Sequence, residues 1–168
     1  TKNALQLAIS LLGVQAHQSA NAETQDALQT AMGRLRRVGA VHELLTYQGN
    51  SPDTIQAADY LHRLCREMED SANGSSGQVH IEVEADDEAA WAPDLVVPLG
   101  LIVGEALTNA LKHAFPDNRS GRVLVELSAK GGGWMLLRVE DDGVGMPPKR
   151  RNGSLGLRLI DMLAKQIK

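Results

Sequence analysis

The sequence predicts an α+β protein in two parts, a helical hairpin over residues 1–50 and a mixed domain over residues 51–168. Three observations predict this fold class. Apolar residues recur at helical spacing through the first 48 residues, which contain no proline. Residues 99–115 form another apolar stripe of helical period. Segments on both sides of that stripe alternate apolar and polar residues, as half-buried strands do.

The first helix is predicted to end near His17, and it is apolar on two faces. One stripe contains Leu5, Ala8, Ile9, Leu12 and Ala16, and the other contains Leu7, Leu11 and Val14. Ser19 and Asn21 are candidate caps in a short turn, after which a second helix runs to about Gln48. An antiparallel hairpin cannot cover both faces of its first helix. Pairing with a second copy, which gives a four-helix bundle in a homodimer, is the economical solution.

The second part begins where Ser51-Pro52-Asp53 has the cap-then-proline order of a helix start. The first predicted elements after it are a helix that ends at the turn 73–77 and a strand over 79–84. The helix 99–115 follows, with Pro98 in its first turn. Two strands over 122–128 and 134–140 are joined by the glycine-rich turn 130–133, and a last helix begins near Ser154.

Composition excludes several classes of protein. The net charge of −4 argues against a general binder of nucleic acids or anionic membranes. The single cysteine, Cys65, excludes an internal disulfide and a cysteine-rich metal site. The sequence contains no run of about 18 apolar residues, the length that a membrane-spanning helix needs. The sequence opens inside a helical pattern, which resembles a fragment edge. We expect a cytoplasmic location, with a parent protein that an upstream domain can attach to a membrane.

A second, narrower stripe on the helix 99–115 contains polar side chains. Glu105, Asn109, Lys112 and His113 fall together at helical spacing. A solvated face usually carries scattered Glu and Lys, so an aligned Asn indicates a site. On this helix alone, a plain surface face remains the alternative.

Two glycine-rich segments follow the last predicted strand. Asp141-Asp142-Gly143-Val144-Gly145 lets the backbone approach a ligand closely, although an ordinary glycine-rich turn has the same composition. The basic cluster 149–151 suits a polyanion or is a solvated loop. Gly153-Ser154-Leu155-Gly156-Leu157 then opens a helix, whose free N–H groups favour a phosphate.

The order and spacing of these motifs are more specific than any one of them. Glu105-x-x-x-Asn109-x-x-Lys112-His113, then Asp141-x-Gly143-x-Gly145, then Gly153-x-x-Gly156-Leu157 resemble the N, G1 and G2 boxes of the GHKL ATPase and kinase superfamily. The segments 2–16 and 41–45 resemble the dimerisation helices of HWE-like sensor histidine kinases. The resemblance covers essentially the whole chain. It implies a GHKL (Bergerat) α/β sandwich after the helical hairpin, with the last strands of that sandwich beyond Lys168.

The resemblance also implies roles for the helix 99–115. Asn109 would coordinate a Mg²⁺ ion that bridges the phosphates of ATP, for which an amide oxygen is a suitable hard ligand. Glu105 would orient the water or hydroxyl environment of the metal and assist proton transfer. Lys112 and His113 would lie near the phosphates.

The glycine-rich segments receive the remaining roles. Asp141 would accept a hydrogen bond from the adenine amino group, and Gly143 and Gly145 would make room for the base. Gly153, Leu155 and Gly156 would belong to a lid that brings backbone N–H groups to the phosphates.

The function that the resemblance implies is ATP-dependent autophosphorylation on histidine, followed by transfer to an aspartate of a response-regulator receiver domain. The family's acceptor histidine precedes the lysine that matches Lys2 by three residues, so it would lie before Thr1 or be lost. His17, His42 and His62 are poor candidates for it. Two alternatives stay open, namely a phosphotransfer or docking module of the same fold that does not use ATP, and an anti-sigma-type serine kinase.

Overall fold

A computed structural model of the chain describes residues 2–47, 54–73, 78–86, 90–145 and 155–166. Its tertiary contacts divide the chain into two compact units, Thr1–Asp53 and Thr54–Lys168. The predicted boundary near residue 50 stays a prediction, because residues 48–53 lie outside the described ranges. Each unit is treated by itself.

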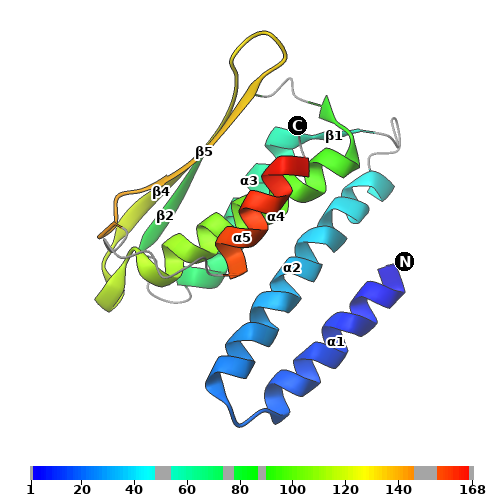
Figure 1. The fold of residues 1–168 in the computed structure, drawn as a ribbon, viewed down its shortest axis with the longest axis vertical. Helices are drawn as coiled ribbons and strands as arrows, with labels where there is room; N and C mark the ends of the chain where they lie inside the picture. The colour runs from blue at the N-terminus through cyan, green and yellow to red at the C-terminus, as the bar shows by residue number, and fades with distance from the viewer. Residues whose placement is uncertain (1, 48–53, 74–77, 87–89, 146–154, 167–168) are drawn as a thin grey trace. The chain divides into compact units, whose positions relative to one another are not determined.

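The first unit is a helical hairpin of α1 (Lys2–Gln18) and α2 (Ala22–Tyr47), coloured blue in Figure 1. Asn21 caps α2, because its side-chain oxygen accepts the backbone N–H groups of Glu23 at 2.8 Å and Thr24 at 3.2 Å. The helices are antiparallel: a Cβ built on Gly39 would lie 2.8 Å from the Leu5 side chain near the open end. The predicted cap and helix order are confirmed.

The second unit is a mixed α/β domain. Its elements, in order, are β1 (Ile55–Gln56), α3 (Ala57–Asn73), β2 (Val79–Ala85), β3 (Ala90–Trp91), α4 (Pro93–His113), the 3₁₀ turn η1 (Pro116–Asn118), β4 (Gly121–Ala129), β5 (Met135–Asp141) and α5 (Leu155–Gln166). Strands β2, β4 and β5 form one sheet in that order. β4 pairs parallel with β2 and antiparallel with β5.

One face of this sheet is covered by helices, with α3, α4 and α5 on the same side (Figure 1). Strand alternation points one set of side chains at the helices, and it includes Val123, Val125 and Leu127, each at most 1% exposed. The opposite face carries charges, such as Glu126 and its 2.7 Å ion pair with Arg138. The two-layer α/β arrangement expected from the sequence is confirmed.

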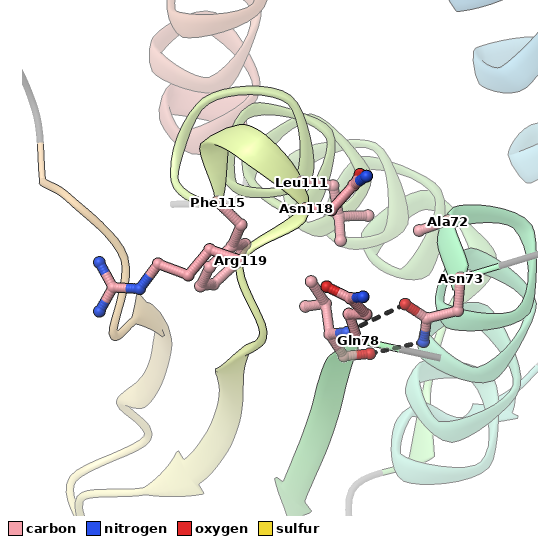
Figure 2. Close-up of a pocket in the computed structure, with 8 residues that line it drawn as sticks. Ala72, Asn73, Gln78, Leu111, Phe115, Asn118 and Arg119 are labelled. Atoms are coloured by element: carbon pink, nitrogen blue, oxygen red, sulfur yellow. Dashed lines mark hydrogen bonds between the residues drawn. The ribbon is translucent and has the colours of Figure 1, made fainter. Parts of the chain in front are cut away.

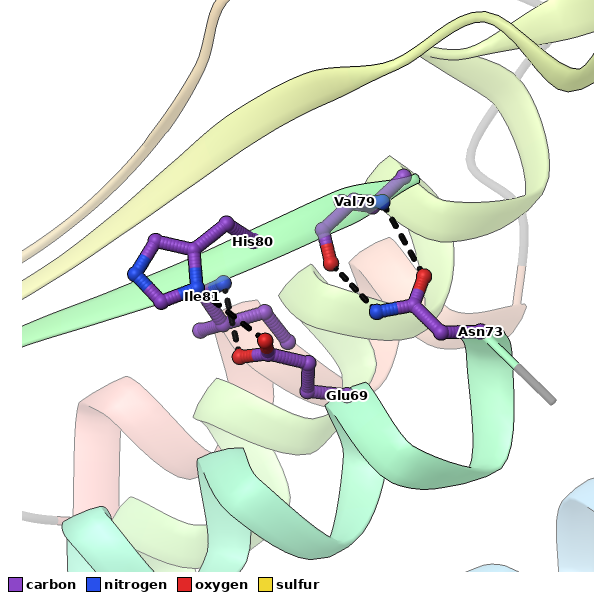
Figure 3. A network of polar contacts seen from close by, with 5 residues as sticks. All are labelled: Glu69, Asn73, Val79, His80 and Ile81. Atoms are coloured by element: carbon purple, nitrogen blue, oxygen red, sulfur yellow. Dashed lines mark hydrogen bonds and ion pairs between the residues drawn. The ribbon is translucent and has the colours of Figure 1, made fainter. Parts of the chain in front are cut away.

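The outer edge of β2 is held by side chains of α3, as Figure 3 shows. The Asn73 amide both donates to the Val79 carbonyl (2.6 Å) and accepts from the Val79 N–H (3.0 Å). One oxygen of Glu69 accepts the Ile81 N–H at 2.9 Å, and the other lies 3.0 Å from Nδ1 of His80. These bonds satisfy strand groups that face away from β4, and they fix α3 against the sheet.

The structure corrects three details of the sequence prediction. Helix α4 begins at Pro93, so Pro98 lies inside the helix and not in its first turn. The helix starts there because Pro93 occupies the first helical position, where a missing N–H costs nothing. The helix after residue 53 begins only at Ala57, because Ile55–Gln56 first pairs with Ala90–Trp91 in a short ribbon that was not predicted.

Helix α4 is also long and apolar enough to cross a membrane by length and composition alone. Half of its most apolar stretch is buried inside the protein, and the core helix of a soluble protein can have the same length and composition. Because α4 is largely buried and packs against α3, α5 and strands β4 and β5, we treat it as the core helix of this domain.

Candidate functional site

The polar stripe of α4 is divided by burial. Glu105 is only 3% exposed, whereas Lys112 and His113 at the end of the helix are exposed. Asn109 lies between them, one turn after Glu105, and is half-buried. A carboxylate is seldom buried on a plain solvated face. Burial of Glu105 therefore argues against the surface-face alternative.

The start of α5 lies directly on this stripe. A Cβ built on Gly156 would come within 2.8 Å of Oε2 of Glu105, and 3.8 and 3.9 Å from the amide nitrogen and oxygen of Asn109. A side chain here would crowd a buried carboxylate, so glycine permits the approach. The start of α5 and the polar stripe of α4 therefore meet at Gly156.

Leu155 is the first residue of α5, but its side chain lies outside the described part of the structure. Gly153 and the basic cluster 149–151 also fall outside the described ranges. Their predicted roles stay predictions.

The Asp141 turn meets the C-terminal end of the same helix. Asp141 pairs with Val123, which is fully buried, so its side chain leaves the strand on the helix-covered side of the sheet. Its Oδ1 accepts the Gly143 N–H at 3.1 Å. The Val144 N–H donates to the Ala114 carbonyl, just after α4, at 3.0 Å. The turn is therefore attached to the end of α4.

The two glycines of this turn differ in their surroundings. A Cβ built on Gly143 would overlap the backbone of Ala114, whereas a Cβ on Gly145 would meet no atom within 4 Å. Gly145 instead has a φ of +75°, which L-residues rarely adopt. The absence of a side chain at Gly143 lets the turn pack closely against Ala114. Glycine at position 145 lets the backbone adopt a positive φ.

Helix α4 thus brings the predicted motifs together. Gly156 contacts it at Glu105 and Asn109, and the Asp141 turn contacts it at Ala114. Ala114 follows Asn109 by five positions, which is about 7.5 Å along a helix axis at 1.5 Å per residue.

No role in the site was predicted from the sequence for Asp142 or Arg119. Oδ1 of Asp142 accepts the Arg122 N–H at 2.7 Å, and the Asp142 carbonyl accepts from Nη2 of Arg119 at 3.4 Å. The doublet of aspartates at 141–142 was the available indication, but nothing in it distinguishes the two carboxylates. Only the strand register does so.

A hollow of about 110 Å³ lies at the C-terminal ends of α3 and α4 (Figure 2). It is lined by Ala72, Asn73, Gln78, Val79, Leu111, Phe115, Asn118 and Arg119. Figure 2 shows the guanidinium of Arg119 extending away from the other lining residues. None of the predicted site residues lines it, so we do not assign it to the candidate site.

The sequence matches family models and curated proteins. Residues 1–72 match a family model described as histidine kinase, and residues 76–168 match one described as histidine kinase-like ATPase domain. The chain is 29% identical over 169 residues to blue-light-activated histidine kinase 2 of Erythrobacter litoralis, covering 98% of this chain and 48% of that protein. It is 29% identical over 168 residues to the sensor histidine kinase PdtaS of Mycobacterium tuberculosis, covering 96% of this chain and 32% of that protein.

Solved structures show the same fold. The histidine kinase domain of the Erythrobacter litoralis EL346 blue-light-activated kinase superposes with a TM-score of 0.73 at 24% identity, covering 95% of this chain and 84% of that one. The Acinetobacter baumannii histidine kinase AdeS gives a TM-score of 0.54 at 12% identity, covering 97% and 86%. The chain spans about half or less of the length of the curated relatives named above. It belongs to the family of histidine kinase-like ATPase domains.

Proposed function

We propose that this chain is the catalytic core of a sensor histidine kinase in two-component signalling. It would transfer the γ-phosphoryl group of ATP to a histidine nitrogen, and the phosphoryl group would then pass to an aspartate of a response-regulator receiver domain. The observation that carries the proposal is the meeting of Gly156 and the Asp141 turn on one helix, α4.

The residues of α4 fit a metal–phosphate group. Among the described residues, no group of three or more His, Cys, Asp or Glu side chains is placed to hold a metal. Mg²⁺ does not need such a group, because it is commonly held by one or two protein oxygens together with substrate phosphates and water. The Asn109 amide oxygen would supply the protein ligand. Glu105 would orient water or hydroxyl at the metal, and Lys112 and His113 would lie near the phosphates.

The turn after β5 would hold the base. The Asp141 carboxylate lies on the helix-covered side of the sheet and would accept a hydrogen bond from the adenine amino group. Gly143 and Gly145 would leave room for the ring. Gly153, Leu155 and Gly156 would bring backbone N–H groups to the phosphates at the start of α5, where the helix dipole favours negative charge.

Catalysis in this proposal is positioning and charge neutralisation. A Pγ–O bond of ATP breaks as a P–N bond to histidine forms, and the bound metal would neutralise charge on the phosphates. A cytoplasmic location would supply both ATP and the receiver domain.

The hairpin unit supports a homodimer. Leu7, Leu11 and Val14 recur at helical spacing on α1 and are 61%, 58% and 55% exposed. A second copy would bury this stripe in a four-helix bundle. Sedimentation of the wild-type chain and of Leu11→Glu tests this, with Gln6→Glu as an exposed control on α1. A wild-type monomer would contradict the dimer and would favour the serine-kinase alternative.

The test of nucleotide use is a titration with a non-hydrolysable ATP analogue, with and without Mg²⁺. We expect saturable, magnesium-dependent binding that weakens about tenfold or more in Asp141→Asn and Asn109→Asp, since each change disturbs a contact to a charged or metal-bound group. Asp161→Asn on α5 and Asn3→Asp on α1 are the matched controls. Unchanged affinity in both site variants would overturn the proposal, and no saturable binding by the wild type would favour the docking module.

A further inference from the structure

We propose that Asp142 is a positioning residue, which fixes the Asp141 carboxylate and thereby sets how well the site distinguishes adenine from guanine. The inference rests on the proposed function. It concerns Asp142, which follows the predicted adenine-binding acid and whose role the sequence alone does not predict.

The backbone of Asp142 begins as a continuation of the β4–β5 ladder. Its N–H donates to the Arg122 carbonyl at 3.1 Å. In a regular antiparallel pair, the Arg122 N–H would return a bond to the Asp142 carbonyl. Here the Arg122 N–H donates instead to the Asp142 side chain, at 2.7 Å to Oδ1. The side chain takes the place of its own backbone carbonyl.

This exchange lets the chain leave the strand immediately after Asp141. The released Asp142 carbonyl accepts from the Arg119 guanidinium at 3.4 Å. The next residues then reach α4, where the Val144 N–H donates to the Ala114 carbonyl at 3.0 Å. The turn is consequently held at two points, the first strand residues of β4 and the end of α4.

Asp141 itself is exposed, and its Oδ1 accepts from Gly143 within its own turn. Its position therefore follows that of the turn. Asp142 follows the last residue of β5, and its Oδ1 accepts the Arg122 N–H beside Gly121 at the start of β4. Asp142 is thus placed to orient the turn, because the backbone of β4 engages its carboxylate.

The experiment compares the affinities of the 168-residue chain for non-hydrolysable ATP and GTP analogues with Mg²⁺. Asp142→Ala removes the acceptor, and we expect the ATP-over-GTP preference to fall about tenfold, the size of effect of one lost hydrogen bond. Asp142→Asn keeps an oxygen acceptor and should stay within about threefold of the wild type. Glu140→Ala removes an exposed carboxylate near the end of β5 and should leave the preference unchanged.

Arg119→Ala provides a second measurement on an exposed residue, in case Asp142→Ala does not fold. It should lower the same preference by about two- to threefold. A wild-type preference in Asp142→Ala, or in Arg119→Ala if the former is unfolded, would overturn the positioning role. That outcome leaves the proposed function intact, whereas failure of the wild type to bind ATP would overturn the function itself.

Discussion

Replacing Gly143 by alanine should destabilise the second unit far more than the same change at Gly145. A Cβ on Gly143 would lie 2.5 Å from the Cβ of Ala114 and 2.8 Å from its carbonyl carbon. These atoms sit at the end of α4 and cannot rotate away as a flexible side chain does. The turn must therefore shift, which breaks the bond from Val144 to Ala114.

The expected cost follows from these contacts. Overpacking costs about 1–3 kcal/mol, and the lost hydrogen bond adds about 1 kcal/mol. At Gly145 no atom lies within 4 Å of the new Cβ, but φ is +75°. A left-handed L-residue costs about 1–2 kcal/mol, and the loss of glycine's freedom in the unfolded chain offsets about 0.4–1 kcal/mol of it.

Urea unfolding followed by tryptophan fluorescence measures the difference. Both tryptophans, Trp91 and Trp134, lie in the second unit, so the fluorescence reports on that unit. With an m-value of about 2 kcal/mol/M, Gly143→Ala should lower the midpoint by about 1–2 M and Gly145→Ala by about 0.8 M or less. Equal midpoints for the two variants, or a larger loss at Gly145, would refute the packing argument.

Three further predictions concern α3 and its contact with β2. Burial, with a smaller contribution from the Glu69 carboxylate, raises the pKa of the Cys65 thiol to about 12, so the folded chain should resist alkylation at pH 8. Burial opposes ionisation of Glu69, but the Ile81 N–H and His80 outweigh it and hold its pKa below the ordinary 4.5. The stability that Glu69 contributes should therefore be present above pH 4.5 and be lost as pH falls through the lowered pKa. Asn73→Ala removes two bonds to Val79 and should cost about 1–3 kcal/mol in urea unfolding.

Each of these predictions has a control. Alkylation of Cys65 should become fast in urea, and fast alkylation of the folded chain would contradict its burial. Glu69→Gln should flatten the dependence of unfolding free energy on pH below about 4.5, and an unchanged slope there would exclude Glu69 as its source. Asp70→Ala, an exposed change on the same helix, should leave the midpoint unaffected, and an equal loss there would contradict the role of Asn73.

The sequence predicted the elements whose pattern is local. The helix and strand periods, the Asn21 cap and the turn 130–133 all depend on neighbouring residues, and the structure confirms them. The ribbon of β1 and β3 was missed because two-residue strands have no measurable period. Pro98 was misplaced because the helix start was assigned to the wrong one of two prolines.

The sequence by itself determined which side chains and glycines are available and in what order they occur. Only the tertiary structure decided that Glu105 is buried, that Gly156 lies on it, and that Asp142 turns the chain toward Ala114. These contacts join residues about 20 to 50 positions apart, and they depend on how the helices pack on the sheet. Local periodicity carries no information on that packing, because it specifies the face that a residue occupies but not the element that the face will meet.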